Sequence, residues 1–171
     1  IFIPAGDSQQ PVERTRLAGV LSGNRFGESS PLHFKQQQVD IFDAKGAVEF
    51  IVREMALGAL GDPKGLHFNI PADGKGEPYA EEGYSLQLMG GTQLLGSLGK
   101  VKMDVLRNFS IKHDVYFFDL DYDALCHLKT TSKQFSSLPV YPSVKRDIAL
   151  VVAQSVSAGE LMAAVRSSRE K

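Results

Sequence analysis

The sequence predicts an α+β fold in which an antiparallel sheet carries flanking helices. Short apolar runs with strand character recur along the chain, and several are joined by tight glycine turns. Only one segment has the period of a long amphipathic helix. Strands and helices do not alternate regularly, as they would in a parallel sheet built from βαβ units. These three observations together favour an antiparallel sheet with its helices packed on one face.

The first predicted elements are strands. Phe2-Ile3 has the character of the tail of a strand whose beginning is missing. The chain starts at Ile1 without an initiator methionine, and it lacks the basic region of a signal peptide, so we expect a piece of a longer chain. Arg14–Ser22 is a predicted core strand that ends at Gly23-Asn24. A polar loop follows over residues 24–38.

The next segment is the clearest helix, and Asp40 is a suitable N-cap for it. Apolar residues recur there at a spacing of three to four, which places them on one face. They are Ile41, Ala44, Val48, Ile51, Val52 and Met55. The other side carries charges at i, i+4 spacing that can pair, namely Lys45, Glu49 and Arg53. Gly58 or Gly61 is expected to end the helix.

Several shorter elements follow the helix. Leu66–Ile70 is a predicted strand, and the polar, glycine-rich stretch Pro71–Gly83 is a predicted mobile loop. Tyr84–Met89 and Gln93–Val101 are predicted to form a hairpin around Gly90-Gly91, because glycine readily supplies the positive φ of a tight turn.

A last strand and a small helix complete this part of the chain. Ser110–Leu120 is the predicted strand, with apolar residues at Val115, Phe117 and Phe118. Asp121 or Asp123 is expected to cap a short helix over Ala124–Leu128.

A second, smaller part follows the polar linker Lys129–Ser137. We place the domain boundary near Ser136, which divides the chain into residues 1–136 and 137–171. Pro139 and Pro142 hold the residues before them in extended backbone.

The second part is predicted to be an incomplete βα unit. The adjacent opposite charges Arg146-Asp147 are followed by an apolar, partly β-branched run, so Lys145–Val152 is a predicted strand buried on both faces. Ser157 and Glu160 have the Ser-x-x-Glu spacing of a capping box, and they begin a predicted helix that runs to about Ser168.

Composition limits the classes of function. Hydrophobic residues make up 43% of the 171 residues, enough for a core, and charged residues make up 23%. The net charge of −1 does not indicate RNA binding by the whole chain. A local basic bias near the C-terminus is interpreted as a solvated face; it comprises Lys129, Lys133, Lys145, Arg146, Arg166, Arg169 and Lys171. The single cysteine, Cys126, excludes an internal disulfide and fits a reducing cytoplasm.

No group of residues has the spacing of a catalytic or metal site. The four histidines, His33, His67, His113 and His127, are widely separated. Cys126 is expected to be buried filler in its short helix. Two groups of aspartates are not interpreted as sites. The first group is expected to cap a helix, and the second lacks the glycine and the distal glutamate of a calcium-binding EF-hand loop. They are Asp40 with Asp43, and Asp119 with Asp121 and Asp123.

The glycine-rich run Gly96–Gly99 lacks the neighbouring cations that would make it a phosphate-binding loop. Lys100 and Lys102 follow it, but a lysine cannot form the bidentate fork that arginine forms with a phosphate. We interpret these glycines as positions where a strand approaches its neighbour closely. The sequence therefore predicts no catalytic, cofactor-binding or metal-binding residue.

Several motifs, in a consistent order, resemble the β subunit of bacterial phenylalanyl-tRNA synthetases. The helix start Val39–Glu49, with Asp-Ala-Lys-Gly at its centre, is similar to that family's pattern. Leu17–Gly23, Leu95–Val101 and Phe117–Leu125 are similar to the strands around it. Pro142–Ile148 matches the family's Pro-x-x-x-Arg-Asp-hydrophobic signature.

This resemblance implies a fold and a role. Residues 1–136 would be a non-catalytic module with the class II synthetase fold, and residues 137–171 the truncated start of a ferredoxin-like anticodon-binding domain. The partners would be a catalytic α subunit, in a heterotetramer, and tRNA(Phe). The whole enzyme would use ATP and Mg²⁺ in the cytoplasm, and the fragment alone would be inactive. The sequence departs from the family at Glu77-Pro78-Tyr79, where a histidine and an arginine are absent.

Alternatives remain open at this stage. Lys145, Arg146 and Asp147 are candidates either for contact with tRNA or for a structural hinge, and the hinge is preferred because basic neighbours are few. The whole chain could instead be a stand-alone domain that binds a small ligand, with residues 71–83 as its lid. A minimal RNA-binding module is the third hypothesis.

Overall fold

The computed structural model divides the chain into two compact units, Ile1–Thr130 and Thr131–Lys171. The predicted domain boundary near Ser136 lies outside the described residues, as do Pro139 and His33. The described residues are 1–3, 10–26, 37–58, 60–61, 65–72, 74, 76–130, 135, 141–142 and 144–168.

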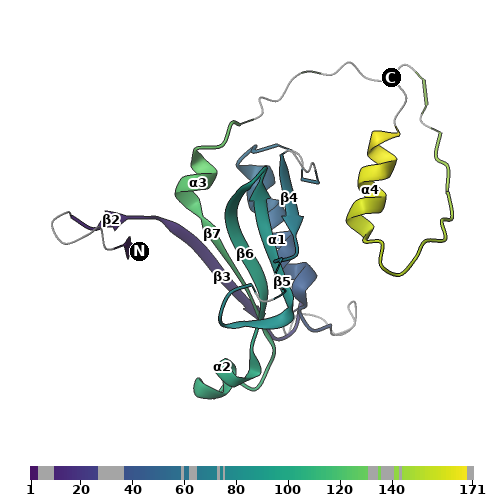
Figure 1. Cartoon of the computed structure of the whole chain (residues 1–171). Helices are drawn as coiled ribbons and strands as arrows, with labels where there is room; N and C mark the ends of the chain where they lie inside the picture. The colour runs from purple at the N-terminus through teal and green to yellow at the C-terminus, as the bar shows by residue number, and fades with distance from the viewer. Residues whose placement is uncertain are drawn as a thin grey trace. The chain divides into compact units, whose positions relative to one another are not determined.

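The first unit is built on a five-stranded antiparallel sheet in the order β3-β7-β6-β5-β4 (Figure 1). Its strands are β3 (Arg16–Ser22), β4 (Leu66–Asn69), β5 (Ala80–Gly90), β6 (Gln93–Val101) and β7 (Val115–Asp121). The predicted α+β class with an antiparallel sheet is therefore confirmed. β3 was predicted as a core strand, but it lies at an edge of the sheet, and its residues alternate between half-buried and exposed.

One long helix, α1 (Ile41–Glu54), covers one face of this sheet. Asp40 is the N-cap, as predicted, and accepts hydrogen bonds from the backbone N–H groups of Phe42 and Asp43. The apolar side of the helix faces the sheet, because Ala44 and Val48 are completely buried. Lys45 pairs with Glu49 on the other side.

The C-terminus of α1 differs from the prediction. Ala56, not Gly58 or Gly61, takes the left-handed conformation there, with φ of 54°. Its N–H donates to Arg53 O, and Leu57 N–H donates to Val52 O at 3.2 Å, which is the Schellman pattern. The burial of Leu57 against the core favours this ending, although a glycine would adopt the same φ with less strain.

The central hairpin joins β5 to β6. Gly90 pairs with Gln93, so the two-residue turn is Gly91-Thr92, one residue beyond the predicted position, and Gly91 has φ of 60°. β5 begins at Ala80, which shortens the predicted loop 71–83 from its C-terminal end. A register irregularity between Ala80 and Ser85 explains why alternation in the sequence did not reveal this start.

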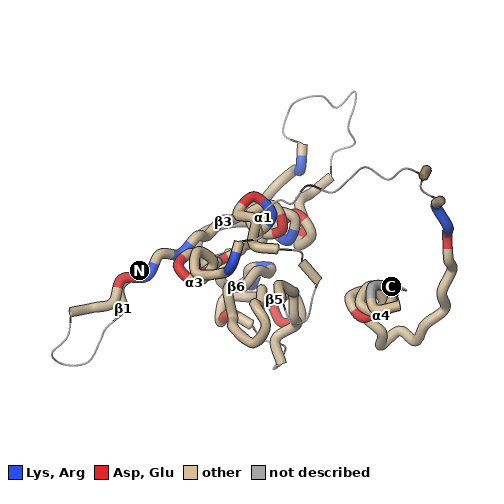
Figure 2. The backbone as a smooth tube through the Cα atoms, turned by 90° about the horizontal axis from the view of Figure 1, so that it is seen from above, with Lys and Arg blue, Asp and Glu red and all other residues tan. Residues whose placement is uncertain are grey.

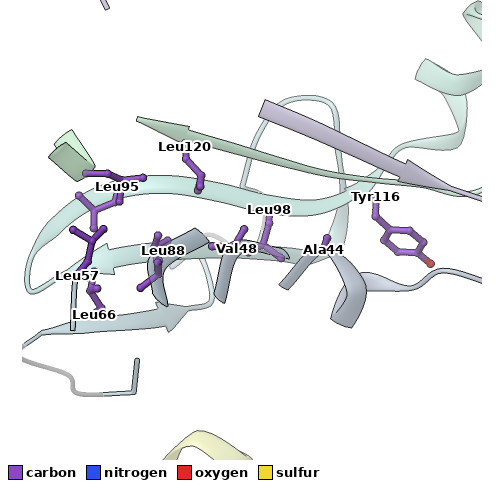
Figure 3. Close-up of a cluster of buried hydrophobic side chains, with 11 residues drawn as sticks. Ala44, Val48, Leu57, Leu66, Leu88, Leu95, Leu98, Tyr116 and Leu120 are labelled. Atoms are coloured by element: carbon purple, nitrogen blue, oxygen red, sulfur yellow. The ribbon is translucent and has the colours of Figure 1, made fainter. Parts of the chain in front are cut away.

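The core lies between the sheet and α1 (Figure 3). Leucines of the central strands point toward the helix, and Leu88, Leu98 and Leu120 have no exposed surface. A second, smaller cluster lies on the opposite face of the sheet, around Phe117 and Leu106. No helix of the described part has the length and apolar character that a membrane crossing requires.

Two short helices flank the sheet, at opposite ends of it (Figure 1). α2 (Met103–Asn108) was not predicted, and β7 consequently starts at Val115 rather than Ser110. α3 (Tyr122–Cys126) follows β7, and Asp121 caps it by accepting from Ala124 N–H, as predicted.

A two-stranded hairpin precedes β3 in the chain. It pairs β1 (Phe2–Ile3) with β2 (Val12–Glu13) in antiparallel fashion. The prediction that Phe2-Ile3 is part of a strand is confirmed. The hairpin projects from the sheet on the side of β3 (Figure 1).

The second unit contains α4 (Ala158–Ser167), whose predicted capping box is present. Ser157 N–H donates to Glu160 Oε2 at 2.7 Å, and Glu160 N–H donates to Ser157 Oγ at 3.2 Å. These hydrogen bonds from Ser157 lower the pKa of Glu160.

The predicted strand Lys145–Val152 is not formed. The segment has no regular secondary structure and is exposed, including Ile148 and Val151. A strand needs a neighbour to satisfy its backbone N–H and C=O groups, and no described strand pairs with this segment. An apolar, β-branched composition favours a strand only where a neighbouring strand is available to pair with it.

Candidate functional site

Gly96 and Gly99 in β6 allow close approach between strands, as predicted. A Cβ atom at Gly96 would lie 2.5 Å from Asp119 O on β7. A Cβ atom at Gly99 would lie 2.5 Å from Tyr84 O on β5. The two positions therefore pack backbone against backbone on both sides of the central strand.

The two lysines after these glycines are occupied by other partners. Lys100 Nζ lies 3.2 Å from both Glu81 Oε2 and Asp114 Oδ1. Burial alone would lower the pKa of Lys100, but its hydrogen bonds to Asp114 and Glu81 outweigh this and raise it. Lys102 Nζ donates to Pro78 O at 2.8 Å. Both ammonium groups thus have partners within the chain.

The sheet face opposite α1 is covered at its centre by residues 76–79. Ser97 Oγ donates to Glu77 Oε1 at 2.9 Å, and the Tyr79 ring meets the Phe117 ring edge-on at 4.9 Å. Gly76, with φ of 61°, lies so close that a Cβ there would be 2.1 Å from Ser85 Oγ. Residues 76–79 thus cover this part of the sheet face.

Residues 76–79 also bring a negative charge, that of Glu77, onto this face of the sheet. Burial raises the pKa of Tyr79, and the negative charges of Glu77 and Asp119 raise it further. Arg16 on β3 balances part of this charge, with Nε 2.9 Å from Asp119 Oδ1. The hydrogen bond to Asp119 raises the pKa of Arg16. A carboxylate beside Ser97 disfavours an anionic ligand there.

The alternating aspartates at the end of β7 bind the chain that enters β3. Besides the Arg16–Asp119 pair, Asp123 Oδ2 accepts from Thr15 N–H at 2.8 Å, and Asp121 lies 3.9 Å from Arg14. Among the described residues, no group of three or more histidine, cysteine or carboxylate side chains is arranged to hold a metal ion. These contacts give each of the three aspartates a partner within the chain.

Asp40 and Asp43 act at the N-terminus of α1, also as predicted. Asp40 N–H donates to Asp43 Oδ2, and Arg25 bridges both carboxylates, at 3.2 Å to Asp40 and 2.9 Å to Asp43. Burial alone would raise the pKa of Asp43, but the hydrogen bonds from Arg25 and Asp40 lower it. No local pattern indicated that Arg25, from the polar loop, would take part.

Two of the described histidines contact the backbone. His67 Nδ1 is 3.3 Å from Gly65 O, and His127 Nδ1 is 2.6 Å from Asp123 O, so both contact backbone carbonyls. The prediction that Cys126 is buried filler is wrong, because Cys126 is exposed. Successive residues of a helix point about 100° apart, and α3 turns Leu125 into the core instead.

Lys145, Arg146 and Asp147 lie in the exposed segment of the second unit, without regular secondary structure. Their assignment as a tRNA contact or a hinge therefore stays a prediction.

The outer side of α1 is the apolar surface that sequence reasoning missed. Phe42 and Phe50 point away from the sheet and are 73% and 54% exposed. Gly46 lies between them, and a Cβ there would meet open space. The spacing of 42, 46 and 50 is the signal that could have revealed this second stripe. We call Phe42, Gly46 and Phe50 the outer stripe of α1.

A hollow of about 530 Å³ adjoins the outer stripe. It is lined by Gly46, Glu49, Phe50, Val52, Arg53, Gly58 and Leu60. The Arg53 guanidinium lies over the Phe50 ring, 5.2 Å from its centroid. Acidic and basic residues alternate along the rest of α1 (Figure 2), so the apolar surface has a polar rim.

Comparisons with known proteins give one consistent result. The family model described as the phenylalanyl tRNA synthetase beta chain CLM domain matches residues 1–122. The phenylalanine–tRNA ligase beta subunit of Desulfotalea psychrophila is 57% identical over 171 residues, which cover 100% of this chain and 21% of that protein.

More distant relatives agree. The corresponding beta subunit of Syntrophotalea carbinolica is 30% identical over 172 residues, covering 100% of this chain and 20% of the relative. That of Geobacter metallireducens is 28% identical over 169 residues, which cover 99% of this chain and 20% of the relative. The chain thus spans about a fifth of the length of the curated relatives it matches.

Proposed function

Because the chain belongs to the phenylalanyl-tRNA synthetase beta chain family, we propose that it is an architectural part of a phenylalanine–tRNA ligase β subunit. Residues 1–136 form a non-catalytic module of class II synthetase type, and residues 137–171 begin a ferredoxin-like anticodon-binding domain. The module docks against a catalytic α subunit, in a heterotetramer of the cytoplasm, and carries the second domain toward tRNA(Phe). ATP and Mg²⁺ serve the chemistry of the whole enzyme.

The observation that supports docking is the outer stripe of α1 with its hollow. Two phenylalanines that point into solvent from a well-packed helix leave apolar surface exposed, although Arg53 lies over one of the two rings, that of Phe50. Exposed apolar surface with a polar rim is typical of protein interfaces. The catalytic subunit is the proposed occupant, because a protein named as a beta subunit works with another chain.

The proposal that this module forms no adenylate has separate support. Adenylate formation needs cationic groups that grip phosphates. The residues present do not fit ATP and its metal, because Lys100 is paired with two carboxylates and Glu77 places a negative charge on the sheet face. The lid of the alternative hypothesis, residues 71–83, also loses its support, since residues 76–79 pack on the sheet and Ala80–Gly83 belong to β5.

We infer that Lys145, Arg146 and Asp147 serve mainly as a hinge between the two domains. In an assembled ligase, Arg146→Ala should then leave the KM for tRNA(Phe) and its salt dependence nearly unchanged. A several-fold rise in this KM together with a shallower salt slope would favour direct contact with the phosphates instead.

Assembly of the full-length subunits tests the docking proposal. We expect Phe42→Ala with Phe50→Ala to weaken association with the α subunit by roughly tenfold or more, since truncating a buried interface aromatic costs about 1–4 kcal/mol. Phe109→Ala is the matched control, because Phe109 is also 73% exposed but lies at the end of α2. Sedimentation of mixed subunits measures the association, and equal effects of both variants would refute the assignment.

A further inference from the structure

The helix α1 carries apolar residues on two opposite faces. Ala44 and Val48 pack on the sheet and have no exposed surface (Figure 3). Each turn of about 100° per residue places Gly46, two positions from both, on the far side of the helix, together with Phe42 and Phe50. A helix that is apolar on both sides is expected to lie between two layers of structure. The sheet is the first layer, and the exposed phenylalanines mark the place of a second.

Gly46 lies in the interior of α1, where a glycine is unfavourable. It loses more conformational freedom in a helix than alanine does. Its backbone does not need positive φ, and a Cβ atom there would meet open space. Gly96 and Gly99 differ, because a Cβ at either would collide with the backbone of a neighbouring strand. Nothing in the described residues therefore requires glycine at position 46, whereas close approach of a partner to α1 would.

The spacing of the outer stripe of α1 fits a second helix. Phe42 and Phe50 are eight residues apart, which is about 12 Å along the axis. A helix with its side chains is about 10–12 Å wide, so one helix can lie between the two rings. Without a side chain at Gly46, its backbone can approach to the short end of the usual interaxial range of about 8–10 Å. An extended segment fits less well, because its N–H and C=O groups would face a helix whose own backbone groups are already bonded.

The charged residues beside the outer stripe favour a protein as the occupant. Lys45 pairs with Glu49, and Arg53 Nε lies 3.5 Å from Glu54 Oε1. Nucleic acid would need cations that are free to meet its phosphates, and both of these cations already have a carboxylate beside them. An apolar centre with a rim of paired charges is typical of a surface that meets another protein.

The hollow of about 530 Å³ begins at the same point of the helix. Gly46 and Phe50 line it from α1, and Gly58 and Leu60 line it from the segment that follows. A helix that crosses α1 at Gly46 would direct side chains into this hollow. Large apolar side chains would fit best, because a pocket near the centre of an interface is the usual place for such an anchor.

We propose that an α-helix of the catalytic α subunit crosses α1 at Gly46. It lies between Phe42 and Phe50, and an apolar side chain of this helix enters the hollow beside Gly58 and Leu60. The inference rests on the proposed function, which makes the α subunit the occupant of the outer stripe. It adds the kind of element that docks, the point of closest approach, and the role of a glycine that the chain itself does not need.

Gly46→Ala provides the first test, because it should change folding and assembly in opposite directions. In this chain alone we expect the folding equilibrium constant to rise by roughly two- to fivefold, since alanine favours the helix and its Cβ meets open space. In full-length subunits we expect association with the α subunit to weaken several-fold. Urea unfolding measures the first effect and sedimentation of mixed subunits the second. Unchanged or tighter association would overturn the proposal.

A larger side chain at the same position gives the second test. Gly46→Leu should weaken association by roughly 5- to 150-fold, the usual effect of overpacking a close contact. Gly159→Leu is the matched control, because Gly159 is also an exposed glycine of a helix, and a Cβ there would have only Ser157 Oγ nearby, at 3.8 Å. The control should leave association unchanged. Equal effects of the two substitutions would refute a crossing at Gly46.

These results can be told apart from a failure of the proposed function. If the Phe42→Ala, Phe50→Ala variant weakens association and Gly46→Leu does not, the docking surface stands but no helix crosses it at Gly46. If neither weakens association, the docking assignment itself fails. If Gly46→Leu destabilises the full-length β subunit without any α subunit present, another part of the β subunit covers the stripe, and the proposal is overturned as well.

Discussion

Among the described residues, two that are not glycine adopt left-handed backbone, and both follow a helix. Ala56 follows α1 with φ of 54°, and Ser110 follows α2 with φ of 57°. In each case the next residue donates to a carbonyl of the last turn, Leu57 to Val52 O and Ile111 to Leu106 O. The local hydrogen bonds therefore outweigh the strain of the Cβ atom in both cases, and at Ala56 the burial of Leu57 adds to them.

Relief of this strain gives a prediction. Ala56→Gly should increase the free energy of unfolding by about 0.5–1 kcal/mol, because glycine adopts positive φ without the Cβ penalty. Urea denaturation of the chain measures the change. Gly58→Ala is the control and should be destabilising, since Gly58 has φ of 109°. A loss of stability in Ala56→Gly would show that the conformation carries no strain.

Two buried serines on adjacent strands offer a matched pair. Ser97 donates to Glu77, whereas Ser85 Oγ has no hydrogen-bond partner among the described residues. We expect Ser97→Ala to cost about 1 kcal/mol and Ser85→Ala to be neutral or stabilising by up to about 1 kcal/mol, because only the first loses a hydrogen bond. Thermal unfolding compares the two variants, and a larger cost at Ser85 would contradict this account.

At the scale of elements, the N-terminus of α1 joins three charged residues from two segments. Arg25 holds Asp40 and Asp43, and the pKa of Asp43 is lowered. A carboxyl with a lowered pKa in the folded state stabilises the fold at pH values above its unfolded pKa of about 3.9, and this contribution is lost as the pH falls through the folded value.

The expected result is a pH-dependent difference between the wild type and Asp43→Asn. The variant should be less stable at neutral pH. The gap should begin to shrink below about pH 4, where the unfolded state takes up the proton, and it should close once the pH falls below the lowered pKa of Asp43 in the folded state, where Asp43 is protonated in both states. Denaturation midpoints across this range give the measurement. A gap that stays constant with pH would mean that the charge of Asp43 contributes nothing.

The elements also show how far the sequence leads. α1 was predictable because its cap and apolar period agree, and the β5–β6 hairpin because glycines mark its turn. α2 was missed since Lys102 offers no capping side chain and the helix has six residues. The Lys145–Val152 run has strand composition, but pairing depends on a neighbour that local sequence cannot reveal.

The candidate site was predictable only where it depends on local sequence, as the elements were. The missing phosphate-binding arginines and the close approach at Gly96 could be inferred from local chemistry. The engagement of Lys100 with Glu81 and Asp114 is a tertiary contact, and so is the turn that brings Glu77 onto Ser97. Only the outer stripe of α1 left a local signal that went unused, the four-residue spacing of Phe42, Gly46 and Phe50.

At the scale of the molecule, the buried core belongs to one unit. Every buried apolar side chain of the described residues lies between Ala44 and Leu125. We therefore expect residues 1–130 alone to unfold in one cooperative transition. Far-ultraviolet circular dichroism and tyrosine fluorescence in urea should give coincident curves for this piece. Separate transitions, or loss of any transition, would mean that the sheet depends on residues 131–171.

The Arg16–Asp119 contact joins residues 103 positions apart. β3, near the start of this chain, pairs with β7 only, so it has no partner within the described sheet until the last strand exists. During synthesis the helix and the β5–β6 hairpin can form from neighbouring residues, but β3 must wait for nearly the whole unit to be translated. The entropic cost of closing this long loop is therefore met only after β7 has been synthesised. Pairing of β3 with β7 is then the step that completes the sheet.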